Sequence, residues 1–129
     1  MPYVHIVIGL ALIEFFGFGL AVAGARGRYN VVAPATTGHE IFDRYFRVQM
    51  NTLEQLVIFI PGILIFARYF NPYVAAGLGA VFVIGRLMYF FGYVKDPKKR
   101  EAGFILTVLP NSILVIGGIV GAIRALFSG

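Results

Sequence analysis

The sequence predicts an all-α integral membrane protein, an up-down bundle of four transmembrane helices in a single domain over residues 1–129. Hydrophobic residues make up 59% of the chain and charged residues only 13%, and the mean hydropathy is +0.83. Four apolar stretches cover most of the chain. Each is long enough for a helix to cross the hydrocarbon core, which takes about 20 residues. Short connections between most of them favour antiparallel neighbours.

The first span is Val4–Ala25, whose one charged residue is Glu14. A cleaved signal peptide is the alternative. However, Met1–His5 has no Lys or Arg, and the apolar run exceeds a typical signal-peptide core. We therefore interpret it as a retained helix, with Glu14 facing the interior or an interface. The following segment, Tyr29–His39, contains proline and glycine and predicts the longest loop of the chain.

The second helix is expected to begin near Glu40 and to continue past Arg68, so that it protrudes from the membrane at one end. It contains the apolar stretch Val48–Ala67, in which Pro61 predicts a kink that membrane helices tolerate. The Asn71-Pro72 pair marks a short turn into the third helix.

The third span runs to Tyr93 and is interrupted by Arg86, whereas the fourth span, Ala102–Ile123, carries no charge. Asp96-Pro97 resembles an N-cap followed by proline at the first helical position, so the fourth helix should begin there. Cations at a helix N-terminus oppose the helix dipole, and with the free backbone N–H groups they favour a bound anion. Three cations follow the proline at this point: Lys98, Lys99 and Arg100.

Basic residues flank the spans unequally. Two of them, Arg68 and Arg124, lie on the side of the termini, and eight lie in the first and third connections: Arg26, Arg28, Arg44, Arg47, Lys95, Lys98, Lys99 and Arg100. The positive-inside rule then places these connections in the cytoplasm and both termini outside. The net charge of +5 reflects this topology rather than nucleic-acid binding. A short chain without a tail or retention signal favours a bacterial inner membrane over the endoplasmic reticulum.

A polar stripe lies in the second helix at Arg47, Asn51 and Glu54, spaced i, i+4 and i+7 so that all three share one helical face. An ionisable group beside lipid costs a few kcal/mol, roughly, unless it is paired. A second stripe, Arg86 with two tyrosines three and seven residues later, lies on one face of the third helix. Both stripes fall toward the predicted cytoplasmic side.

Two interpretations of these stripes stay open on spacing alone. One is an ion-pair network of Arg47, Glu54 and Arg86 that stabilises an oligomer. The other is a binding site for a small peptide-like molecule, because arginines suit carboxylates, a glutamate suits an ammonium group and an asparagine suits an amide. The donors and acceptors expected near this site are Arg26, Arg47, Gln49, Asn51, Glu54, Gln55, Arg86, Tyr89, Tyr93 and Arg100.

The chain has no cysteine, so it offers neither a thiolate metal ligand nor a thiol nucleophile of its own. Its two histidines, His5 and His39, lack the spacing of metal ligands, and we predict no metal site. Any sulfur chemistry must therefore use the thiol of a substrate.

Three segments resemble motifs of the MAPEG superfamily, the membrane-associated proteins in eicosanoid and glutathione metabolism. Phe46–Glu54 contains Arg-x-x-x-Asn-x-x-Glu, Gly85–Tyr93 resembles the motif of the third helix, and Thr36–Gly38 resembles that of the first loop. They occur in the family's order and spacing over nearly the whole chain. The likeness is greatest to the branch of leukotriene C synthase, microsomal glutathione transferases and the five-lipoxygenase-activating protein.

The resemblance implies a homotrimer that binds glutathione as co-substrate between subunits, near the cytoplasmic face and without a metal. Arg100 occupies the position of the arginine that stabilises the glutathione thiolate. The thiolate would then attack a hydrophobic, lipid-like electrophile from the bilayer. The implied glutathione contacts are Arg26, Arg47, Gln49, Asn51, Glu54, Gln55, Tyr89 and Tyr93.

Two positions depart from leukotriene C synthase. Its second adjacent arginine is replaced here by Gly27, for which Arg28 is a candidate substitute. Arg28 and Arg86 are therefore given only as supporting residues. Gln55 stands where that enzyme has a tyrosine. These departures favour a general glutathione transferase or peroxidase over leukotriene synthesis. The alternative is a non-catalytic lipid-binding scaffold, like the lipoxygenase-activating protein of the same branch.

Overall fold

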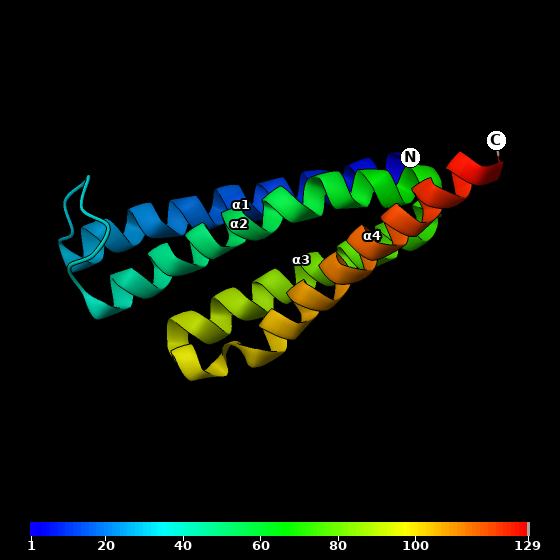
Figure 1. The fold of residues 1–129 in the computed structure, drawn as a ribbon. Coiled ribbons are helices and arrows are strands. Elements are labelled where there is room, and N and C mark those ends of the chain that lie inside the picture. The colour runs from blue at the N-terminus through cyan, green and yellow to red at the C-terminus, as the bar shows by residue number, and fades with distance from the viewer. Residues whose placement is uncertain (129) are drawn as a thin grey trace.

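The computed structural model describes residues 1–128 and contains, in that range, only helices and their connections. Consecutive helices run antiparallel, and both chain termini lie at one end of the bundle (Figure 1). We call the other end, formed by residues 30–39 and 96–100, the basic end. All four long helices are apolar enough to span a membrane, which confirms the predicted fold class. The elements are α1 (Pro2–Tyr29), α2 (Glu40–Tyr69), α3 (Pro72–Lys95), the 3-10 helix η1 (Pro97–Arg100) and α4 (Glu101–Ser128).

The predicted starts of the last three helices are confirmed, and each has a side-chain cap. His39 Nδ1 accepts a hydrogen bond from a backbone N–H of α2 at 3.1 Å. Asn71 Oδ1 accepts from two backbone N–H groups of α3 at 2.8 and 3.0 Å. Asp96 Oδ1 accepts from the N–H two residues on, at 3.0 Å. The fourth helix begins as η1, however, and Lys99 (φ −92°, ψ 20°) separates this turn from α4.

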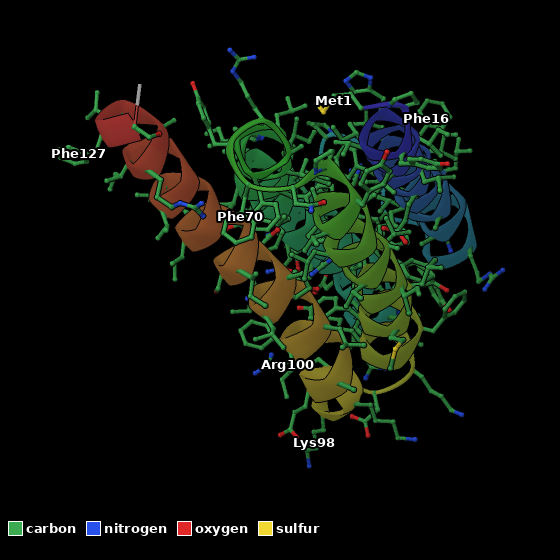
Figure 2. All side chains as sticks on the ribbon, turned by 90° about the vertical axis from the view of Figure 1, so that its right-hand side faces the viewer. Met1, Phe16, Phe70, Lys98, Arg100 and Phe127 are labelled. Atoms are coloured by element: carbon green, nitrogen blue, oxygen red, sulfur yellow. The ribbon has the colours of Figure 1, made fainter. Side chains whose placement is uncertain are left out.

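Helices α1 and α4 each pack on both α2 and α3, so the latter two form the middle of the bundle. At its centre the rings of Phe59 and Phe82 stack with centroids 4.0 Å apart. The outward surface is apolar as well: Ile13 and Phe16 are 71% and 70% exposed, and Figure 2 shows Phe16 on the outer side of α1. An exposed apolar surface of this extent suits lipid rather than water.

The basic end is tied together by Arg44 of α2. Its Nη1 donates to the carbonyl oxygens of Val94 and Lys95 at 3.1 and 3.2 Å, and its Nη2 donates to Glu40 Oε1 at 3.0 Å. The last carbonyls of a helix lack partners within the helix, so this arginine caps α3. It thereby fixes the start of α2 against the end of α3, where the two predicted polar stripes lie.

Candidate functional site

A pocket of about 420 Å³ opens at the basic end between α2, α3 and the start of α4. Six of its eight lining residues were expected from the sequence. The stripe of the second helix and the two tyrosines of the third-helix stripe therefore face one pocket, with Arg100 beside them. Figure 2 shows Arg100 at the same end of α4 as Lys98 and far from Phe127. The lining residues are Arg47, Asn51, Glu54, Tyr89, Tyr93, Arg100, Glu101 and Phe104, of which Glu101 and Phe104 were not anticipated.

The α2 side of the pocket offers both signs of charge. Arg47, Asn51 and Glu54 reach it from one helical face, as their spacing predicts. Within residues 1–128, the only ion pair with an N···O distance of 4.0 Å or less joins Arg44 to Glu40, at the start of α2. Arg47 and Glu54 thus do not neutralise each other within this chain. Both charges are available to a ligand.

The α3 side consists of two stacked tyrosines. The rings of Tyr89 and Tyr93 lie 5.5 Å apart and within 12° of parallel. Arg86 lies one turn deeper, is 0% exposed and does not line the pocket. Its guanidinium carbon lies 4.4 Å from the centroid of the Tyr89 ring, a cation–π contact. Arg86 therefore stands behind the pocket wall, in the supporting position considered from the sequence.

Arg86 joins three helices through hydrogen bonds. Its Nη2 donates to Asn51 Oδ1 at 2.9 Å and to Thr52 Oγ1 at 2.8 Å, and its Nη1 donates to Thr107 Oγ1 at 3.2 Å. Each threonine hydroxyl donates in turn to the carbonyl four residues earlier in its own helix. Sequence reasoning missed both threonines. No sequence signal marks them, because single small hydroxyl residues are common in membrane helices.

Two expected contacts lie away from the pocket in this chain. Arg26 Nη1 donates to the carbonyl oxygen of Ala35 at 2.6 Å, and its guanidinium carbon lies 5.0 Å from the centroid of the Phe42 ring. Arg26 therefore holds the α1–α2 loop. Gln49 faces α1, where a Cβ on Gly19 would be 3.1 Å from Gln49 Nε2. The structure does not bring these two side chains to the stripe residues.

Gln55 is also outside the main pocket. It lies in a second groove of about 370 Å³ between α2 and α4, where its Oε1 accepts from Asn111 Nδ2 at 3.1 Å. Asn111 was not anticipated, and its buried Oδ1 has no partner among the described residues. Within one chain Gln55 does not reach the pocket of the Arg47 stripe, because adjacent residues of a helix point about 100° apart, and its contact with glutathione stays a prediction. The groove's other residues are Ile58, Val108, Ser112, Val115 and Ile116.

Arg28 is exposed and borders a separate hollow of about 280 Å³, which includes Tyr45 and Phe90. It does not reach the main pocket within one chain. Glu14 faces the interior, and in residues 1–128 neither of its buried carboxylate oxygens has a hydrogen-bond partner. The same part of the chain holds no cluster of three His, Asp or Glu side chains suited to a metal.

Four membrane-spanning helices with a pocket of arginines and tyrosines at one end define a class of small integral membrane proteins. The chain belongs to the MAPEG family, whose model matches residues 4–120, and the resemblance seen in three motifs is thus confirmed.

Relatives in this family come from bacteria and mammals. The chain is 46% identical to an uncharacterized protein of Synechocystis, an alignment covering 88% of this chain and 83% of that protein. It is 41% identical to human microsomal glutathione S-transferase 2, covering 81% and 71% respectively. Identity to leukotriene C4 synthase of Cavia porcellus is 36%, covering 66% and 57%.

Proposed function

We propose that the protein is a membrane glutathione S-transferase, with peroxidase activity as a further reaction, that attacks hydrophobic, lipid-like electrophiles. The observation that carries the proposal is the 420 Å³ pocket, which combines two arginines, two glutamates, an asparagine and two tyrosines. This volume lies within the usual range for small-molecule sites, about 300–1,000 Å³. The similarity to a microsomal glutathione S-transferase and to a leukotriene C4 synthase supports the same interpretation.

Glutathione presents carboxylates, an ammonium group, amides and a thiol, and the pocket has a partner for each. Arg47 suits a carboxylate through its two-pronged guanidinium, and Glu54 suits the ammonium group. The hydroxyls of Tyr89 and Tyr93 can each donate or accept. Because Arg47 and Glu54 are not paired with each other, a ligand does not have to break an existing ion pair to bind.

Thiol activation is assigned to Arg100. A free thiol has a pKa of about 8.5 and is mostly protonated at neutral pH. A guanidinium beside the sulfur stabilises the thiolate, and each unit of pKa corresponds to about 1.4 kcal/mol. The thiolate then attacks the electrophilic carbon, so that a sulfur–carbon bond forms as the bond to the leaving atom breaks. An oxygen leaving group, such as that of an opened epoxide, takes up a proton.

We infer that a second copy of the chain completes the site, in a homotrimer. Arg26 and Gln49 lie away from the pocket in their own chain, so they would contribute to the pocket of a neighbour. The groove between α2 and α4 offers the hydrophobic electrophile a route from the bilayer. In this arrangement the basic end is cytoplasmic, both termini lie outside, and the membrane is a bacterial inner membrane.

Glutathione titration of the purified protein in detergent tests the proposal. We expect saturable binding together with the ultraviolet absorbance of a thiolate, and conjugation of chlorodinitrobenzene. Arg100→Ala should abolish the thiolate signal, whereas Arg124→Ala, at the opposite end of the bundle, should retain it. Wild-type protein without glutathione binding or turnover would contradict the proposal. Binding of a lipid ligand alone would instead favour the non-catalytic scaffold.

A further inference from the structure

We propose that Arg86 is a positioning residue that holds the Asn51 amide in one orientation, with its Nδ2 toward the pocket. Asn51 then acts as a hydrogen-bond donor and binds a carboxylate or carbonyl oxygen of the thiol peptide. This inference rests on the proposed glutathione site and specifies which groups of the ligand that site recognises.

The orientation of Asn51 follows from what a guanidinium can do. A guanidinium only donates hydrogen bonds, so the Asn51 atom that faces Arg86 Nη2 at 2.9 Å has to be the oxygen. The amide nitrogen points the other way. Since Asn51 lines the pocket, its two N–H donors are available to a ligand there. A donor repels the ammonium group of the peptide, which leaves that group to Glu54.

The constraint on Asn51 is strong because Arg86 has little freedom to turn. It is 0% exposed and donates to acceptors on both α2 and α4, and its guanidinium stacks on the Tyr89 ring. Both threonine hydroxyls use their hydrogens on backbone carbonyls, so each presents a lone pair to Arg86. Rotation of Arg86 would leave several buried polar groups without partners, which is costly in an apolar interior.

The buried guanidinium of Arg86 is compensated by hydrogen bonds to α2 and α4 and not by one to Glu14 of α1, whose carboxylate oxygens have no partner in the described chain. A buried cation is expensive without compensating charge or hydrogen bonds. The arrangement therefore keeps a charged arginine directly behind the pocket wall. The bond to Asn51 connects this interior network to the ligand.

The direct test compares Asn51→Asp with Asn51→Ala in glutathione titrations of the full-length protein in detergent. An aspartate at this position still accepts a hydrogen bond from Arg86. Its second oxygen replaces the amide nitrogen, however, so it has no donor for the ligand oxygen and repels it. We expect Asn51→Asp to raise the dissociation constant by about tenfold or more, and by more than Asn51→Ala does, since a hydrogen bond to a charged group contributes roughly this factor. Binding by Asn51→Asp as tight as in the wild type would overturn the proposal.

A double-mutant cycle tests whether Arg86 acts through Asn51. Lysine keeps the charge but cannot reproduce the forked geometry. Arg86→Lys should weaken glutathione binding about fivefold to tenfold in the wild-type background and less than about twofold in Asn51→Ala, because coupled residues are not additive. The thermal midpoint of each variant, measured in the same detergent, checks that a loss of binding is not a loss of folded protein. Additive effects on binding would show a merely structural role.

Arg68→Lys, at the exposed far end of α2, is the matched control and should leave binding unchanged. If Arg86→Lys does not fold, the comparison of Asn51→Asp with Asn51→Ala decides alone. Wild-type protein that binds no glutathione would remove both this inference and the proposed function. If the wild type binds glutathione and Asn51→Asp binds it equally tightly, only the positioning role is removed.

Discussion

Gly103 of α4 lies directly against the backbone of Tyr89 in α3: a Cβ at Gly103 would be 2.4 Å from the Tyr89 backbone nitrogen. Real Cβ atoms essentially never come this close to a neighbour. The contact therefore requires glycine and sets the separation of α3 and α4. Arg100 lies three residues before Gly103, so the same contact places the proposed thiolate-stabilising arginine beside the tyrosines of the pocket.

We expect Gly103→Ala to push α4 away from α3, because its nearest obstacles are backbone atoms that cannot rotate aside. Overpacking of this kind costs about 1–3 kcal/mol. The thermal midpoint in detergent should fall, and the glutathione thiolate signal should fall with it as Arg100 moves. Gly77→Ala in α3 is the control, since a Cβ there meets nothing within 4 Å. A Gly103→Ala protein as stable and active as the wild type would contradict the role given to this contact.

The pH dependence of turnover should show how the positive charge of Arg100 acts on the bound thiol. In the proposed site the guanidinium lowers the pKa of the bound thiol, so the wild type stays active well below the free thiol value of about 8.5. Without the guanidinium, the Arg100→Ala thiol returns toward that value, and activity at neutral pH is lost. The variant should regain rate about tenfold per pH unit as the pH rises toward 8.5. Identical pH–rate profiles for variant and wild type would exclude Arg100 from thiol activation.

Thr107 should contribute to stability through its hydroxyl. The hydroxyl is buried and accepts from Arg86 while donating to a backbone carbonyl. Thr107→Val keeps the shape but leaves a buried guanidinium donor unpaired, which costs about 1–3 kcal/mol. Thr107→Ser keeps the hydroxyl and should be the more stable of the two. We expect this order in thermal unfolding, and the reverse order would mean that the methyl group matters more.

The fold follows from the sequence because length, hydropathy and capping residues act locally. Four apolar stretches and the caps at Asn71 and Asp96 determine where the helices lie. The pocket was also predictable, since Arg47, Asn51 and Glu54 share a face by helical period alone. An up-down bundle then brings that face to the third-helix stripe.

The roles of Arg86, Thr107 and Asn111 could not be predicted from the sequence, because they depend on how deeply a residue is buried and on which helix packs against it. Arg86 shares a stripe with Tyr89 and Tyr93, but it lies one turn deeper and is fully buried. Periodicity cannot separate a residue that lines a pocket from one that supports its wall. Thr107 and Asn111 left no signal either, because single small polar residues are common in membrane helices. Their roles depend on which residue of another helix faces them.

The groove between α2 and α4 provides the test of how the electrophile is bound. Ser112 is an exposed residue of this groove, so a larger side chain there should fill it without disturbing the core. Ser112→Phe should raise KM severalfold for a long-chain electrophile and leave KM for glutathione unchanged, because Arg47 and Tyr93 lie in the other pocket. Small chlorodinitrobenzene should be little affected. Ile119→Phe, on the exposed face of α4 outside the groove, is the control. If Ser112→Phe left KM for the long-chain electrophile unchanged, the hydrophobic substrate would have to approach Arg100 by another face of the bundle.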